Sequence, residues 1–268
     1  MSQAARAAGC SLRGSLRRGL VAEWLLNGRQ TAVTGNGITV GDTMRRHSLA
    51  SSFTVSRLIG TAGLASVGGG HFVATNHAGA SYTLADVVGG KMVSIEAWAK
   101  APANAYGQLC VVSRAAPYIG FWFRAGANTS TMDWFSNQAD SPLMSTAIPN
   151  DGRFHQIAMR QYFDGAGCSI ETFIDGARAE VRTGTALNAA SSIAGCVTNI
   201  GSDTILGGAY TWGSPIASVR LWNRSITPSE VRAMYAIGPH SASRPSLLFR
   251  TTFANAWLPS LMSRRSSR

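Results

Sequence analysis

The stretch that decides the fold is IASVRLWNRSITPSEVRAMY, residues 216–235. Its first seven residues are typical of a strand, and its second half is typical of a short helix. Thr227 stands at the N-cap position, Pro228 at the first helical position, and Glu230 three residues after the cap, which is the Thr-x-x-Glu pattern of a capping box. We therefore predict a strand that leads into one short, well-capped helix ending near Gly238.

The rest of the chain reads as strands. In KMVSIEAWAKA, residues 91–101, every second position is small or apolar, as Val93, Ile95, Ala97 and Ala99 are. This alternation is typical of a strand, because successive side chains of a strand point to opposite faces of a sheet. Similar runs are QLCVVSR, YIGFWFRAG, FHQIAMRQYF, CSIETFI and ARAEVR.

Turn residues separate these runs. Asp175 and Gly176 lie between IETFI and ARAEV, and an Asp-Gly pair tolerates the positive φ angles of a two-residue type I′ hairpin. Many strands joined by glycine-rich turns, with almost no amphipathic helix, favour an all-β fold. We predict a two-sheet antiparallel jelly-roll sandwich with one short C-terminal capping helix.

The positive charge lies at the two ends of the chain. The formal net charge is +11, and nine of these charges are arginines within residues 1–19 and 239–268, which contain no acidic residue. The interior is nearly neutral, which argues against a basic nucleic-acid-binding face on a folded domain. We predict a basic N-terminal arm over 1–18, a globular domain over 19–238, and a basic C-terminal tail over 239–268.

The sequence also excludes some classes of protein. It has no run of 18 apolar residues and no evident signal peptide, so we expect no membrane partner. The acid-free start fits either an interaction arm or an organellar transit peptide. The four cysteines are too widely spaced for a zinc site: Cys10, Cys110, Cys168 and Cys196.

Several motifs occur in a familiar order. They are GLVAEWLLNG with TGNG, VSIEAWAK, GRFHQIAMRQYFDG with IETFIDG, NIGSD and the closing strand–helix unit. Together they resemble the concanavalin A-like lectin/glucanase jelly rolls of the laminin G-like domain family. The resemblance implies two antiparallel sheets with variable rim loops. Members of this family bind carbohydrate or protein, some through calcium, and glycoside hydrolases use the same fold, so the fold alone does not decide the function.

Catalytic patterns are missing from the sequence. Hydrolases that resemble this fold carry a Glu-x-Asp-x-x-Glu cluster, which does not occur here. The nearest carboxylate pair is Glu171 and Asp175, and Asp175 is explained as a turn residue. We therefore predict no catalytic residue and expect that the chain is not an enzyme, with a glycan-active hydrolase or lyase as the alternative.

Calcium is an open alternative, because that ion needs several oxygen ligands. No loop has the dense acidic spacing of a dedicated site, and the family's FDG element is replaced by the acid-free HFVATNHAGASYTL. We predict no metal ligand and no cofactor. The acidic residues available in rim loops are Asp133, Asp140, Asp151, Asp164 and Asp203.

Sugar binding requires aromatic rings beside polar side chains. Trp134 and Asn137 lie in STMDWFSNQAD, and Tyr210 and Trp212 lie in the glycine-rich GGAYTWGS. Core packing is an equal alternative for each of the aromatic residues. We predict that Trp134, Asn137, Tyr210 and Trp212 form a carbohydrate-binding site.

These observations favour a non-catalytic, lectin-like module for recognition or assembly. Arginine-rich arms without a signal peptide suit a phage virion protein of the capsid, tail or fibre, because virions assemble in the cytoplasm and leave by lysis. The expected partner is a glycan or protein at the rim loops or concave face. The arms would dock on capsid or tail subunits, and a homo-oligomer is open. Nucleic-acid binding through the arms is a further alternative.

Overall fold

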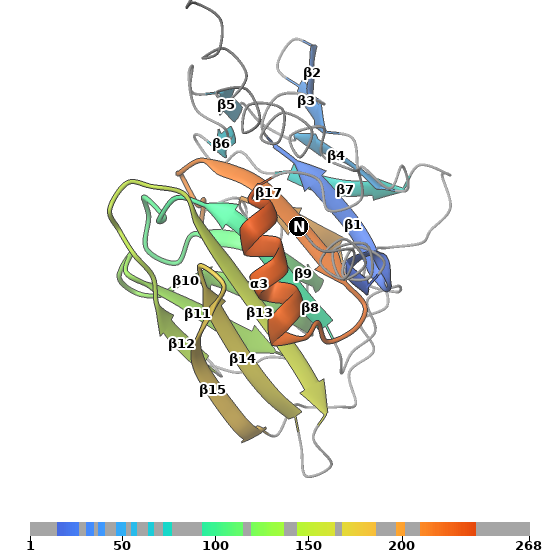
Figure 1. The fold of residues 1–268 in the computed structure, drawn as a ribbon. Coiled ribbons are helices and arrows are strands. Elements are labelled where there is room, and N and C mark those ends of the chain that lie inside the picture. Colours follow the sequence, from blue (N-terminus) through green and yellow to red (C-terminus); the bar gives the residue numbers. More distant parts are fainter. Residues whose placement is uncertain are drawn as a thin grey trace, which may run out of the picture.

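In a computed structural model, the chain forms a sandwich of two antiparallel β-sheets (Figure 1). This confirms the predicted jelly-roll class. The structure describes residues 15–26, 31–34, 37–40, 47–51, 55–57, 64–66, 72–76, 93–114, 119–136, 144–163, 168–185, 197–201 and 210–239.

We call the two layers sheet I and sheet II. In sheet I, β1 (Leu20–Leu25) pairs with β17 beside the main path. That path runs through β15 (Ala177–Thr185), β14 (Cys168–Ile174), β13 (His155–Phe163), β8 (Val93–Ala99), β17 (Ile216–Trp222), β6 (Leu64–Ser66) and β5 (Val55–Arg57).

Sheet II is the other layer. Its order is β12 (Met144–Ala147), β11 (Thr131–Ser136), β10 (Ile119–Ala125), β9 (Gln108–Arg114), β16 (Val197–Ile200), β7 (Phe72–Asn76), β4 (His47–Ser51), β3 (Gly37–Val40) and β2 (Thr31–Thr34). The apolar inner faces of both sheets meet in one core that includes Ile95, Phe123, Trp134 and Val219. Cys110 lies in this core as a free thiol, and burial raises its pKa to about 12.

The predicted helix is α3 (Pro228–Ile237), which lies across the outer face of sheet I (Figure 1). Thr227 is its N-cap, and both hydrogen bonds of the capping box are present. Gly238, with φ of 71°, ends the helix and donates its amide to the carbonyls of Met234 and Tyr235. The local signals in the sequence therefore fix both ends of α3.

The helix buries a second apolar cluster against sheet I. This cluster includes Phe173, Trp222, Val231 and Met234, and each such side chain contributes about 1.5–3 kcal/mol when removed from water. The helix also covers the outer face of β8, where Tyr235 of α3 stacks on Trp98. All seven residues of β8 are buried, and Ser94 bonds to the backbone just before α3.

The hairpin predicted at residues 175–176 is present between β14 and β15. Asp175 has φ of 51° and Gly176 has φ of 77°, as a type I′ turn requires. The register places Ile174 opposite Ala177, so the two turn residues close the hairpin directly.

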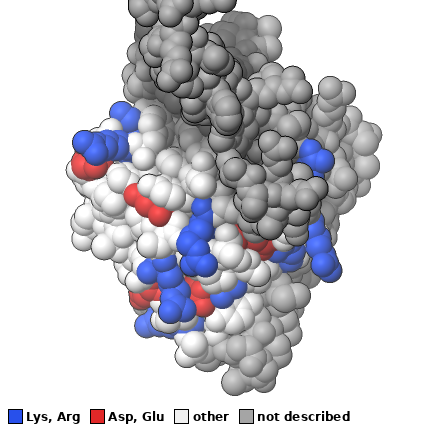
Figure 2. Space-filling view, viewed as in Figure 1, with Lys and Arg blue, Asp and Glu red and all other residues white. Residues whose placement is uncertain are grey.

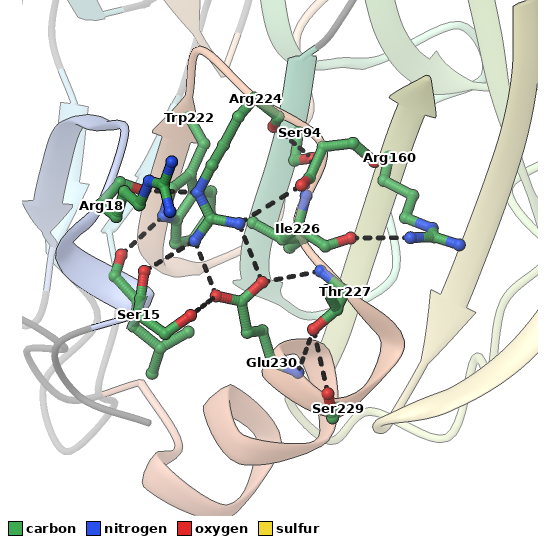
Figure 3. Close-up of polar contacts among 12 residues, drawn as sticks. Ser15, Arg18, Ser94, Arg160, Trp222, Arg224, Ile226, Thr227, Ser229 and Glu230 are labelled. Carbon is green, nitrogen blue, oxygen red and sulfur yellow. Dashed lines mark hydrogen bonds and ion pairs between the residues drawn. The ribbon is translucent and has the colours of Figure 1, made fainter. Parts of the chain in front are cut away.

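Residues 15–18 pack against the strand–helix unit. The Leu16 side chain is fully buried in the cluster under α3, and its carbonyl accepts a hydrogen bond from Trp222 Nε1 at 2.9 Å. Arg224 donates to the carbonyls of Ser15 and Arg18 and to the carboxylate of Glu230, to which the Ser15 hydroxyl also donates (Figure 3). The predicted boundary between residues 18 and 19 lies at the end of this packed segment.

Charges are mixed on the described surface that faces the viewer. In Figure 2, basic and acidic side chains lie next to one another there rather than in a patch of one sign. Within the described residues, no helix is both long and apolar enough to cross a bilayer.

Candidate functional site

Strands β10, β11 and β12 direct polar side chains to the outer face of sheet II. Phe123, Trp134 and Met144 lie in the core, and the alternating positions between them point the other way. Arg124 is the register partner of Asp133, which in turn is the partner of Ser145. The Ser145 hydroxyl donates to Asp133 Oδ1 at 2.6 Å and fixes the carboxylate.

Two tyrosines join this polar row at the rim of sheet II. Tyr106 lies in the loop between β8 and β9 and is 39% exposed, and Tyr210 lies in the segment before β17. Their rings meet edge to face, with centroids 6.0 Å apart. The Arg124 guanidinium lies 5.3 Å from the Tyr106 ring centroid, which is within cation–π range. We call Tyr106, Arg124, Asp133 and Tyr210 the rim cluster.

Backbone hydrogen bonds hold both tyrosines in place. The amide of Tyr106 donates to the carbonyl of Gly126 at 3.0 Å, and the amide of Gln108 donates to the carbonyl of Tyr210 at 3.0 Å. Gly107 allows the two segments to approach, because a Cβ there would lie 2.7 Å from the carbonyl oxygen of Thr211. The geometry of the rim cluster is thus set by the ends of strands rather than by long free loops.

Burial and charge act in opposite directions on Arg124. Partial burial lowers its pKa, while the negative charge of Asp133 opposes that shift. A guanidinium titrates so far above neutrality that Arg124 stays charged at physiological pH. The rim cluster therefore combines a cation, an anion and two amphipathic rings.

The structure separates the four carbohydrate-binding residues predicted from the sequence. Trp134 and Trp212 are 1% and 0% exposed, so in this structure neither presents a ring face to a sugar, and their predicted stacking role is corrected. Trp134 packs edge to face on Phe123, while Trp212 Nε1 donates to the carbonyl of Lys100 at 3.1 Å. Bulky aromatic rings serve here to fill the core.

Tyr210 is half-buried and belongs to the rim cluster, whereas Asn137 lies outside the described residues. Sequence reasoning missed Tyr106 and Arg124. The alternation of IGFWFRA could have placed Arg124 opposite the core, but nothing local brings the Tyr106 loop next to residue 210.

The carboxylates considered for hydrolysis have other partners. Glu171 accepts from Arg160 Nε at 2.9 Å and from the Tyr162 hydroxyl at 3.2 Å. Asp175 sits in the β14–β15 turn and pairs with His155. Both therefore serve ion pairs and hydrogen bonds within sheet I and its turn.

The acidic residues considered for calcium are only partly described. Asp133 belongs to the rim cluster, and Asp151 lies beside His155. Among the described residues, no group of three His, Cys, Asp or Glu side chains could hold a metal ion. The other three candidates, Asp140, Asp164 and Asp203, lie outside the described ranges.

Solved structures share this fold at low sequence identity. A mutant of Trypanosoma rangeli sialidase displaying trans-sialidase activity has a TM-score of 0.58 and 16% identity, covering 80% of this chain and 32% of that chain. The binding domain of botulinum neurotoxin DC in complex with SialylT has a TM-score of 0.54 and 9% identity, covering 83% and 52%. The same domain in complex with rat synaptotagmin II has a TM-score of 0.54 and 12% identity, with equal coverage.

The present chain thus spans about a third of the length of the sialidases and about half of the neurotoxin domain. This likeness corrects the prediction that the chain is not an enzyme. That prediction is wrong as an exclusion, because sialidases are among the proteins that contain this fold.

The family is established by sequence. No curated protein matches the chain. Residues 69–232, more than half of the chain, match the family described as the Concanavalin A-like lectin/glucanases superfamily. This range includes β8, β13, β14, β17 and the start of α3, which carry VSIEAWAK, GRFHQIAMRQYFDG, IETFIDG and most of the closing strand–helix unit. The chain belongs to the concanavalin A-like lectin/glucanases superfamily.

Proposed function

We propose that the chain is a recognition domain that binds a glycan through the rim cluster. The observation that carries this proposal is the convergence of Tyr106, Tyr210 and the Arg124–Asp133 pair at one end of sheet II. Of the described elements outside the two sheets, α3 and the segment 15–18 pack on sheet I, at the opposite face of the sandwich.

The chemistry of the rim cluster suits a sugar. A pyranose ring has an apolar C–H face, which stacks on aromatic rings, and a periphery of hydroxyl groups. Tyr106 is 39% exposed, enough to offer a ring surface. The guanidinium of Arg124 donates several hydrogen bonds in one plane, so it fits hydroxyl oxygens at the sugar edge.

The solved structures lend general support. The botulinum neurotoxin DC domain was solved with SialylT and with rat synaptotagmin II, so one protein with this fold takes both a glycan and a protein ligand. At 9% and 12% identity the likeness extends to the fold, and the ligand class comes to the present chain only as part of this proposal.

The test is a glycan array on the full-length protein with single substitutions. We expect Tyr106→Ala and Tyr210→Ala each to lower the affinity for the bound glycan by about tenfold, which is 1.4 kcal/mol. Tyr235→Ala is the matched control, because Tyr235 is 43% exposed but lies on α3. If glycan binding survived both rim substitutions, or if Tyr235→Ala abolished it, the rim cluster would not be the glycan-binding site.

A second role, docking of the arms, is favoured by where Ser15 and Gly238 lie. The carbonyls of Ser15 and Gly238 both accept hydrogen bonds from arginines of the β17–α3 unit, Arg224 and Arg220. Ser15 and Gly238 therefore both lie on the α3 side of sheet I, away from the rim cluster on sheet II. This arrangement suits a module tethered to a larger assembly such as a virion.

Arm docking can be tested in the full chain by mass photometry. We expect assemblies to disappear when the five arginines of residues 239–268 are replaced by glutamine, while glycan binding persists. A wild-type chain that remains a monomer and binds no acidic surface would contradict the docking role.

A further inference from the structure

We infer that the rim cluster selects a neutral pyranose with two adjacent hydroxyl groups over a sugar that carries a carboxylate. This inference rests on the proposed glycan-binding function and names its ligand class. It follows from the charge balance around Arg124, from the way Asp133 is fixed, and from the shape of the guanidinium.

The charge balance comes from the sheet register. Arg124 on β10 and Asp133 on β11 are direct register partners on the same face of sheet II. The cationic side chain therefore has an acidic side chain beside it, one strand away. The other two members of the rim cluster, Tyr106 and Tyr210, contribute aromatic rings beside this pair. Within the rim cluster, the guanidinium of Arg124 therefore has the carboxylate of Asp133 as its neighbour on the adjacent strand.

Asp133 is built into the fold as a fixed neighbour of Arg124. It is 6% exposed, and the Ser145 hydroxyl holds its Oδ1 at 2.6 Å. Gly126 leaves room for the carboxylate, because a Cβ at that position would lie 3.2 and 3.3 Å from its two oxygens. The hydrogen bond from Ser145 therefore keeps the Asp133 carboxylate in place on the strand next to Arg124.

The guanidinium decides how a sugar would be held. Its N–H groups form a planar fork that donates two parallel hydrogen bonds, and adjacent equatorial hydroxyl oxygens of a pyranose present two acceptors at matching spacing. The Tyr106 ring lies against the same guanidinium, with its centroid 5.3 Å from Cζ, and Tyr210 meets that ring edge to face. A sugar edge on Arg124 therefore places the sugar's C–H face near the tyrosine rings.

A carboxylate could accept the same two hydrogen bonds from the guanidinium. The charge of the ligand is therefore what distinguishes a sugar acid from a neutral sugar. A sugar acid would bring a second negative charge next to Asp133 and would lose its own hydration without meeting an unbalanced cation. A neutral diol incurs neither cost. Asp133 is thus a positioning and selectivity residue, and Arg124 is the residue that contacts the ligand.

The test uses matched sugars on the full-length protein. Oligosaccharides that end in glucose or galactose are compared with the same chains that end in glucuronate or galacturonate. We expect the neutral member of each pair to bind at least about tenfold more tightly. Asp133→Asn should reverse or abolish this preference by leaving Arg124 unbalanced, and Arg124→Gln should weaken binding of the neutral sugar.

Two control variants test whether the changes in affinity arise from the rim cluster itself. Arg178→Gln removes an arginine whose side chain is 59% exposed on β15 of sheet I, and it should leave both affinities unchanged. Ser145→Ala frees the Asp133 carboxylate without removing its charge, so it should reduce affinity while keeping the neutral preference. Thermal unfolding of every variant shows whether the fold is retained.

The outcomes separate this inference from the proposed function. Tighter binding of the acidic sugars that still depends on Tyr106 and Tyr210 would overturn the ligand class and leave the glycan-binding function standing. A neutral preference that Asp133→Asn does not change would overturn the role of Asp133. Binding of neither class would overturn the proposed function and the inference together.

Discussion

Arg220 and Glu96 form an ion pair that is closed to solvent between sheet I and α3. They are register partners on β17 and β8, and Arg220 Nη1 lies 2.9 and 2.7 Å from the two carboxylate oxygens. On the other side, Arg220 Nε donates to Glu23 of β1 at 2.8 Å. All three side chains are fully buried, so one arginine serves carboxylates on both neighbouring strands.

We predict that Arg220→Met destabilises the protein by about 3–5 kcal/mol, because it leaves two buried carboxylates without their cation. Burial already raises the pKa of Glu96, against the attraction of Arg220. Adding Glu96→Gln to Arg220→Met should therefore recover part of the loss. Urea unfolding followed by tryptophan fluorescence measures both values.

The matched control for this substitution is Arg178→Met, which removes an exposed arginine from the same sheet. A loss below about 1 kcal/mol for Arg220→Met, the size found for exposed ion pairs, would contradict the prediction.

The Glu230 carboxylate should make the contact with residues 15–18 sensitive to acid. Burial alone would raise its pKa, but hydrogen bonds from Arg224, Ser15 and Thr227 lower it to about 2. In the unfolded chain a glutamate titrates near 4.3, so this stabilisation is complete above that pH and is lost as the pH falls toward about 2.

We expect the difference in melting temperature between wild type and Glu230→Gln to be largest near neutral pH and to shrink below about pH 4. Arg224→Gln should flatten the pH dependence in the same way, since it removes the carboxylate's main partner. A melting-temperature difference that grows on acidification would contradict this role of the Glu230 carboxylate.

Leu16 should matter for stability although it precedes the predicted domain boundary. Its side chain is fully buried with Val231 and Met234. We expect Leu16→Ala in the full-length chain to cost about 2–5 kcal/mol in unfolding free energy. Val181→Ala is the control, because Val181 is 45% exposed, and it should change stability by less than about 0.5 kcal/mol. Equal losses from the two variants would show that residues 15–18 do not belong to the folded unit.

His155 should stabilise the protein more in mild acid than in alkali. Burial lowers its pKa, but hydrogen bonds to the carboxylates of Asp151 and Asp175, at 2.9 and 2.7 Å, outweigh this and raise the pKa. The contribution is therefore complete below the unfolded value of about 6.5 and is lost as the pH rises through the folded value.

Comparing wild type with His155→Gln at about pH 5.5 and about pH 8.5 should give a larger melting-temperature difference at the lower pH. An NMR titration of the His155 ring reports the pKa directly. A midpoint below the ordinary value, or a larger difference at alkaline pH, would count against this account.

Features that depend on neighbours along the chain were predictable from the sequence. The cap of α3 needs only Thr227, Pro228 and Glu230, and the β14–β15 turn needs only Asp175 and Gly176. These motifs satisfy or bend the local backbone, so their energies are decided within four residues. The alternation in β8 likewise predicted which side chains enter the core between the sheets.

The burial of Trp134 and Trp212 could not be predicted, because an aromatic ring near a loop serves a core and a binding site equally well. The rim cluster could not be predicted from the sequence either. It joins residue 106 to residue 210 and β10 to β11, and only the sheet register brings those segments together.

The sequence by itself determined the family, the all-β class, the capped helix and the near-neutral interior between two basic ends, because these follow from composition and short-range pattern. Tertiary structure alone decided that α3 and the segment before it bury the outer face of β8, that Arg220 serves two carboxylates, and that Tyr106 meets Tyr210 beside Arg124. The physical reason is the same in each case. Long-range pairing of strands sets which side chains are removed from water and which charges become neighbours, and no local pattern encodes that pairing.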